Sequence, residues 1–355
     1  MSEPQPPRTA IVGTRVFDGT TLSEPRTVVI EGSSIAADTS TDGAQIVHAS
    51  GAVLLPGFID AHAHVEHREL LDVLASYGVT TALDMALSTL GRVPGTCDLR
   101  SPGLPAISSR SMQAKIPGMP ETTHVDTPQD AKAFIAGRVA NGADYIKIVL
   151  GDGLDEATAA ALVDAAHAHG LKTVIHAVTS EDYTAAMNTS PEFITHVPLG
   201  QPLTDTQLTR LRSRQIATIP TLTMMEGVAS AVGAPEAAFA GALRSVGLLH
   251  GAGVPILAGT DTNTTEGVPF SPEHGSSLHH ELELLVRAGL RPLEALTAAT
   301  TLPARLFGLT DRGTITPGAR ADLVLLDGDP LSDIRATRAL QRVWCAGIEH
   351  TPACA

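Results

Sequence analysis

Two histidines separated by one residue, His62 and His64, follow the apolar run over residues 53–59. Residues i and i+2 of a β-strand point to the same face, so two imidazoles at this spacing can bind one metal ion. If the apolar run is a strand, the pair lies at its carboxyl end. The sequence therefore predicts a metal site that begins with these two histidines.

The same three residues recur as His167-Ala168-His169, which provides an internal comparison. They end an apolar pattern over residues 155–170 that is typical of a helix, with Asp155 as N-cap and Gly170 just beyond the last turn. Residues i and i+2 of a helix lie on different faces. We therefore interpret this second pair as solvated residues of a last helical turn, not as ligands.

Short β-branched or apolar runs follow His64 at regular intervals, each ending in a polar residue and separated from the next by helix or loop patterns. Seven intervals of about 28 residues lead from His62 to Asp261, which suits a closed (β/α)8 TIM barrel of ordinary size. The first of the eight predicted strands is the run that leads to His62 and His64, and the other seven cover residues 78–84, 104–108, 144–148, 173–176, 193–196, 216–221 and 255–261.

Active sites of such barrels lie at the carboxyl ends of the strands. Six potential metal ligands occupy these ends, and they should converge at one mouth: His62, His64, Lys147, His176, His196 and Asp261. A single strand-end histidine is more often a hydrogen-bonded core residue. Six such residues together favour one site that binds two divalent metal ions, with zinc as the expected metal.

Lys147 is the unusual member of this set, because a protonated amine would be repelled by metal ions. Burial beside cations should lower its pKa from about 10.4. The neutral amine can then react with carbon dioxide to give a carbamate, which offers two anionic oxygens to two metals. We therefore predict that Lys147 is carboxylated.

The chain resembles the amidohydrolase superfamily, in the branch with two metals and a carboxylated lysine. That branch includes Xaa-Pro and Xaa-Arg dipeptidases, ochratoxin amidases and imidazolonepropionase-like relatives. The motifs that carry the resemblance lie in the expected order at residues 55–64, 142–148, 258–261, 298–300 and 317–324. By that resemblance, His62, His64 and Asp261 would bind the more buried metal and His176 and His196 the more exposed one. Lys147 and a hydroxide would bridge the two metals.

Two loops depart from the pattern of dipeptidases in this branch. Residues 113–120 lack a Gly-Gly-His-like segment, and residues 196–200 lack a His-Gly pair. None of the three tyrosines follows the sixth strand, where these relatives have a tyrosine that recognises a substrate carboxylate. A dipeptide substrate is therefore in doubt, whereas the metal chemistry is unaffected, since specificity lies in loops.

Strand and turn signals alternate at both ends of the chain, at residues 9–55 and 321–347. Two short β segments bury one face only by pairing with each other, which predicts one discontinuous β-sandwich beside the barrel. We expect its N-terminal part at residues 1–55, the catalytic barrel at 56–311 and the C-terminal part of the sandwich at 312–355.

The composition of the chain indicates which classes of binding partner to expect. A net charge of −14 argues against nucleic acid and anionic membranes, and leaves a small molecule as the expected substrate. Residues 1–7 lack the pattern of a signal peptide, and Cys97, Cys345 and Cys354 form no disulfide framework, so we expect a cytoplasmic protein. The sequence leaves open whether the chain is a monomer or a homo-oligomer.

Several other polar residues lie near the predicted mouth. Arg110 and Lys115, just after the third strand, could pair with a substrate carboxylate, although a solvated loop charge is the alternative for either. Asp84 could hydrogen-bond a ligand. For His279 and the adjacent His280 in a predicted helix we favour packing or capping. The sequence does not decide the roles of two further loop histidines, His67 and His124.

These observations predict an amidohydrolase that cleaves a carboxamide bond in an N-acyl amino acid, a dipeptide-like compound or a related amide. Asp261 would be the catalytic residue that moves the proton to the leaving amine. A deaminase, or a lactone or cyclic-amide hydrolase on the same barrel, is the alternative, although deaminases usually lack a lysine equivalent to Lys147. A binding protein that lost catalysis would not be expected to keep all six ligands.

Overall fold

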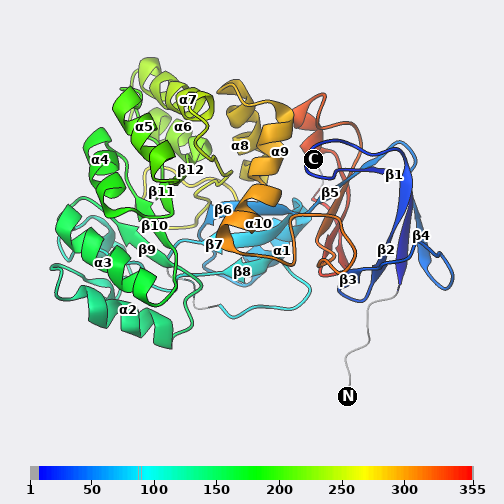
Figure 1. The fold of residues 1–355 in the computed structure, drawn as a ribbon, viewed down its shortest axis with the longest axis horizontal. Helices are drawn as coiled ribbons and strands as arrows, with labels where there is room; N and C mark the ends of the chain where they lie inside the picture. The colour runs from blue at the N-terminus through cyan, green and yellow to red at the C-terminus, as the bar shows by residue number, and fades with distance from the viewer. Residues whose placement is uncertain (1–7, 87, 89, 354–355) are drawn as a thin grey trace.

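The structure is a computed structural model that describes residues 8–86, 88 and 90–353. It has two parts, a β-sandwich made from both ends of the chain and a barrel with helices around it (Figure 1). This confirms the predicted fold class. Residues 1–7 and Cys354 lie outside the described residues, so the predictions made for them stay predictions.

The two ends of the chain share one sheet. Its strand order is β15-β14-β13-β5-β1-β2-β3, with β4 beside β1. β5 pairs antiparallel with β13, and Leu55 lies opposite Val324. The strands are β1 (Thr9–Val16), β2 (Arg26–Glu31), β3 (Ser34–Ile35), β4 (Gln45–His48), β5 (Val53–Pro56), β13 (Leu323–Leu326), β14 (Leu340–Cys345) and β15 (Ile348–His350).

β1 divides this sheet into two layers. Its first half pairs with β2 and β4, whereas its end pairs with β5. The pairing with β2 is irregular between Ile11 and Thr14, where Gly13 has a φ of +79°, a conformation that glycine adopts without steric cost. Trp344 and Leu54 belong to the buried cluster of this sandwich, which is separate from the core of the barrel.

In the part of the chain that the structure describes, the barrel consists of seven short parallel strands and two further segments. Two arcs, β6-β7-β8 and β9-β10-β11-β12, form its wall. On one side, Ala106 of the segment that follows β8 bridges Ile148 of the second arc. On the other side, residues 256–262 join the two arcs by bridging β12 and β6. The strands are β6 (Phe58–Ala63), β7 (Val79–Asp84), β8 (Asp98–Arg100), β9 (Ile146–Val149), β10 (Thr173–His176), β11 (Phe193–Thr195) and β12 (Ala217–Ile219).

Helices surround the barrel (Figure 1), and α10 packs against the apolar side chains of its interior. Phe307 of α10 stacks on Phe193, with ring centroids 4.1 Å apart, and also contacts Tyr145. Tyr145 lies two residues before Lys147, so their side chains point to the same face of the extended chain. Tyr145 packs in the interior of the barrel, and Lys147 follows it toward the cavity. The helices are α1 (Glu69–Ser76), α2 (Ala131–Ala140), α3 (Glu156–Ala168), α4 (Ser180–Thr189), α5 (Asp205–Ser213), α6 (Leu222–Ala231), α7 (Glu236–Gly251), α8 (Ser276–Arg287), α9 (Pro292–Ala298), α10 (Thr301–Phe307) and the short 3₁₀ helices η1 (Gln113–Lys115), η2 (Glu121–Thr123) and η3 (Ile334–Arg338).

The third strand differs from the prediction. The sequence predicted a strand at residues 104–108, but the strand that pairs with β7 is β8, and residues 106 and 107 form only isolated bridges. β8 contains two charged residues, which made it look unlike a buried strand. Their charges are paired: Arg100 lies 2.9 Å from Asp98, and Arg312 lies 2.7 Å from the same carboxylate.

Among the described residues, no helix is both long and apolar enough to cross a membrane. Cys97 and Cys345 are buried free thiols. The cytoplasmic location and the domain boundaries after residues 55 and 311 stay predictions.

Candidate metal centre

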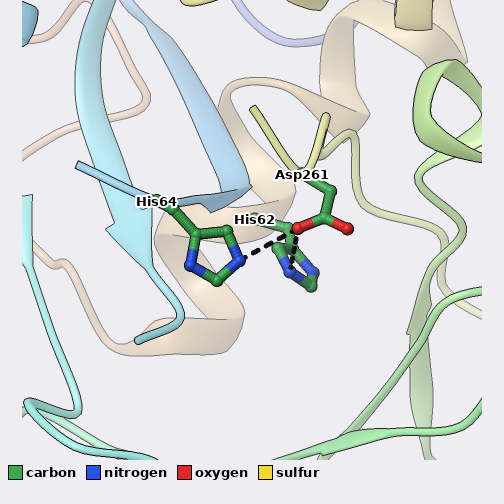
Figure 2. Close-up of side chains that lie close together, drawn as sticks. All are labelled: His62, His64 and Asp261. Atoms are coloured by element: carbon green, nitrogen blue, oxygen red, sulfur yellow. Dashed lines mark hydrogen bonds and ion pairs between the residues drawn. The ribbon is translucent and has the colours of Figure 1, made fainter. Parts of the chain in front are cut away.

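The end of β6 presents two histidines to one carboxylate. The Nε2 atoms of His62 and His64 each lie 3.0 Å from Oδ1 of Asp261 (Figure 2). The three donor atoms all lie within 4.8 Å of one another. His62 is buried, with 1% of its surface exposed, whereas His64 and Asp261 are partly exposed on the cavity side. Two imidazoles and a carboxylate at these distances can bind one divalent metal.

The buried Asp60 connects the end of β6 to the segment that carries Asp261. Its carboxylate accepts hydrogen bonds from the backbone N–H groups of His62 and Thr260, both at 3.1 Å, and from the Thr260 hydroxyl at 2.7 Å. It thereby fixes the backbone beside Asp261, whose φ of +60° is left-handed. Burial raises the pKa of Asp60 to about 7. Burial alone would also raise the pKa of Asp261, but the adjacent histidines keep it well below its usual range.

A second pair of histidines lies beside the first group. Nε2 of His196 lies 2.9 Å from Nδ1 of His176, and Nδ1 of His196 lies 3.8 Å from Oδ2 of Asp261. The rings of His62 and His196 are 5.0 Å apart. The structure therefore places the four predicted histidines and Asp261 close together, and their division between two metal ions stays a prediction.

Burial keeps most of these imidazoles neutral, which is the form that binds metals. Burial, assisted by the charge of Lys147, lowers the pKa of His62 and of His176 to about 3. Burial also lowers the pKa of His196 well below its usual range. For His64, burial is outweighed by the hydrogen bond and charge of Asp261, and its pKa is raised.

Lys147 is 4% exposed and lies in the same cavity. Its Nζ atom is buried and has no hydrogen-bond partner. Burial lowers the pKa of Lys147 to about 7, although the charges of Asp261 and Asp84 oppose the shift. An unpaired buried ammonium is costly, so this amine fits the neutral form that carboxylation requires.

Two threonines orient the histidine rings, and sequence reasoning missed both. Oγ1 of Thr195 lies 2.8 Å from Nδ1 of His62, and the Thr221 hydroxyl hydrogen-bonds Nδ1 of His196. Such partners fix the tautomer and orientation of a ligating imidazole. The available signal was that both threonines are polar residues at ends of predicted strands. Asp84, by contrast, accepts hydrogen bonds from the Val65 N–H and the Ser101 hydroxyl.

A cavity of about 430 Å³ opens above these residues. Beyond the candidate ligands, its wall is mostly apolar and includes the side chains of Met224, Met225 and Phe270. Arg110 and Lys115 are exposed, and neither belongs to this wall. The guanidinium of Arg110 donates to the carbonyl of Gly153 at 2.8 Å. The prediction that one of the two binds a substrate carboxylate stays a prediction.

The other four histidines that the sequence singled out do not line the cavity. His279 hydrogen-bonds the carbonyl of Tyr77 at 3.1 Å, and its ring packs on Phe58, as the preferred packing interpretation expected. His280 pairs with Glu226 at 2.7 Å. His67 and His124 are not part of the cavity wall.

The chain is similar to known proteins along most of its length. The model of the amidohydrolase family matches residues 126–348. The chain is 28% identical to an adenine deaminase of Methylobacterium nodulans over 338 residues, which cover 88% of this chain and 54% of that protein. The chain therefore spans about half the length of that relative.

Solved structures agree in fold. A Xaa-Pro dipeptidase with bound methionine superposes with a TM-score of 0.81 at 20% identity, covering 96% of this chain and 99% of the other. The ochratoxinase of A. niger gives a TM-score of 0.78 at 18% identity, covering 99% and 97%. At these identities the likeness concerns the barrel and the sandwich, and the substrates of those enzymes do not transfer to this chain.

Proposed function

The chain belongs to the amidohydrolase family, and on this premise we propose that it is a metal-dependent hydrolase that cleaves a carboxamide bond in a small molecule. The proposed substrates are N-acyl amino acids, dipeptide-like compounds and related amides. The proposed site contains two divalent metal ions. Their proposed ligands are His62, His64, His176, His196, Asp261 and a carboxylated Lys147.

The observation that carries this proposal is the buried amine of Lys147, which has no partner. His62, His64 and Asp261 already provide one group of donors, and His176 and His196 provide the other. A carbamate on Lys147 would link the two groups. It forms when the lone pair of the neutral Nζ attacks the carbon of carbon dioxide. A new N–C bond forms, one C=O π bond breaks and its electron pair moves to oxygen, and a proton on nitrogen leaves to water.

Bound divalent ions would polarise the amide carbonyl and lower the pKa of the attacking water. The side chains contribute orientation and proton transfer. Thr195 and Thr221 hold the rings of His62 and His196 at their Nδ1 atoms. We assign Asp261 the transfer of a proton from the attacking water to the leaving amine, since its carboxylate faces the cavity from the end of the barrel.

Metal analysis and one substitution test the proposal together. Carefully loaded protein should contain close to two equivalents of metal. Lys147→Ala should lose metal and nearly all activity toward an amide, and small carboxylic acids such as acetate should partly restore both by replacing the bridge. Lys147→Arg should not substitute, because a guanidinium stays charged. Lys132→Ala is the matched control, since Lys132 is exposed on α2.

Two results would contradict the two-metal model. One is a firm value of one metal equivalent with full activity. The other is wild-type turnover of Lys147→Ala, which would show that the lysine only packs. Either result would favour the alternative of a deaminase, the activity named for the relative from Methylobacterium nodulans.

A further inference from the structure

The wall of the cavity has no charged side chain among the described residues once the six proposed ligands are set aside. Four methionines line it, Met85, Met119, Met224 and Met225, and three of these are buried. Methionine side chains are apolar, polarisable and adaptable. A cavity of this kind gains binding free energy from apolar groups of a ligand.

One face of α6 forms part of this wall. Val228 follows Met224 by four residues and Met225 by three, so both methionines lie on the same side of the helix as Val228. Glu281 anchors the start of α6, because its carboxylate accepts the backbone N–H groups of Leu222 at 3.0 Å and of Thr223 at 2.7 Å. These two hydrogen bonds fix the start of the helix that carries the apolar face.

Phe270 closes the wall next to this face. A Cβ atom added to Gly227 would lie 2.1 Å from the Phe270 ring, so the ring packs directly on the backbone of α6. Glycine at this position permits the close approach. The aromatic ring and the side chains of Met224 and Val228 thus belong to one apolar surface.

The polar groups of the wall are neutral. The side chain of Asn263 is already used, because its Nδ2 donates to the Asp261 carbonyl and its Oδ1 accepts from the Thr265 N–H and the Ser271 hydroxyl. Oε1 of Gln113 is buried without a partner. It is an acceptor that could receive an N–H group, and it offers no charge to balance a carboxylate.

We propose that this cavity selects amides whose group beside the scissile bond is neutral and apolar, such as an aryl or alkyl group, and rejects a carboxylate there. The inference rests on the proposed amide hydrolysis and narrows its substrate class to the related neutral amides, because N-acyl amino acids and dipeptide-like compounds carry a carboxylate beside the scissile bond. A carboxylate in this cavity would lose its hydration without gaining a cationic partner. Arg110 and Lys115, which could provide one, lie outside the wall.

Binding of three hydroxamates to the metal-loaded protein tests the inference apart from turnover. They share one metal-binding head: acetohydroxamate has almost no tail, phenylbutyrohydroxamate has an apolar tail, and its para-carboxylated analogue has a charged tail. Calorimetry should show that the phenyl compound binds at least about tenfold tighter than acetohydroxamate, because its tail is buried. The carboxylated analogue should bind at least about tenfold more weakly than the phenyl compound.

The three compounds separate the two ways of failing. If acetohydroxamate binds and the carboxylated tail binds as tightly as the phenyl tail, the inference is wrong while the metal centre stands. If none of the three binds, the metal centre is wrong, and the substrate class that rests on it falls with it.

A substitution on α6 provides a second, independent measurement. Val228 is partly exposed in the wall, so Val228→Lys should fold and place an ammonium in the cavity. The ratio of affinities should then shift toward the carboxylated analogue by about tenfold. Val232→Lys is the matched control, one turn further along, where Val232 is 62% exposed and outside the wall. It should leave the ratio unchanged, and an equal shift in both variants would overturn the inference.

Discussion

The tripeptide His-Ala-His occurs twice in this chain, and the two copies have different environments. His62 and His64 end β6, and both approach the same oxygen of Asp261 at 3.0 Å. His167 lies in the last turn of α3 and His169 is its C-cap. The side chain of His167 is 39% exposed, and its Nε2 pairs with Glu192 at 3.0 Å.

The comparison teaches that the element, and not the spacing, decides whether two such histidines converge on one partner. A strand directs both rings of the first copy to one side, where the barrel brings in a carboxylate from a distant part of the sequence. A helix directs the rings of the second copy apart. Burial also gives the first copy a different protonation behaviour, because it lowers the pKa of His62 to about 3 and keeps that ring neutral.

The largest difference should appear when one histidine is removed from each copy. We expect His62→Ala to lose metal and at least about 10³-fold in kcat/KM, because the transition state then lacks charge stabilisation worth several kcal/mol. His169→Ala should keep both metal content and activity. Elemental analysis and kinetics on the purified pair measure this. If His62→Ala keeps its metal and its rate, the end of β6 is not a metal site.

The carboxylates that pair with the histidines of the two copies, Asp261 and Glu192, provide the next comparison. Asp261→Asn keeps an oxygen donor of similar size but cannot accept a proton, so it should hold much of its metal and lose roughly 10²–10⁴ in kcat. Glu192→Gln, at the partner of His167, should leave kcat unchanged. If Asp261→Asn retains both metals and a near-normal kcat, another residue must carry the proton.

A smaller effect is expected from the residue that orients His62. Thr195→Val removes the hydroxyl that lies 2.8 Å from Nδ1 of His62, and we expect metal affinity to fall by about 10–100-fold. Thr195→Ser keeps the hydroxyl and should restore most of it. Competition with a chelator of known affinity measures both. Equal affinities for the valine and serine variants would show that the hydroxyl does not support the ligand.

Much of the candidate site could be predicted because its proposed ligands are local features of the sequence. His62, Lys147, His176 and Asp261 each end a recognisable apolar run, and strand ends of a barrel meet at one mouth. β8 could not be predicted, because the burial of Asp98 depends on ion pairs with Arg100, which is partly exposed, and with Arg312 from the far end of the chain.

The residues of the cavity wall could not be predicted from the sequence either. Met224 and Met225 look like ordinary residues of a buried helix face, and they reach the cavity only because Glu281, more than fifty residues later, anchors the start of α6. Arg110 was singled out for its charge and its distance from the third strand along the sequence. Its guanidinium instead donates to the Gly153 carbonyl, a contact that depends on the path of two loops.

The smallest effect concerns His279, which is in a helix like His167 but buried like His62. Its Nε2 lies 3.1 Å from the Tyr77 carbonyl, and its Nδ1 is buried without a partner. Burial, assisted by the charge of Arg338, lowers the pKa of His279 to about 4. Below about pH 6.5, His279 therefore binds a proton in the unfolded chain but not in the folded protein. The free energy of unfolding falls as the pH falls through this range.

His279→Gln removes this titration while keeping an N–H donor. We expect the wild type to be the more stable protein at pH 7 and its advantage to shrink toward pH 4.5, by at most about 1.4 kcal/mol per pH unit. Denaturant unfolding of metal-free protein at several pH values measures the difference. His169→Gln, an exposed control, should stay within about 0.5 kcal/mol of wild type throughout. A constant difference between wild type and His279→Gln would mean that this buried ring accepts a proton as readily as the unfolded chain, and that burial alone does not distinguish the histidines of this protein.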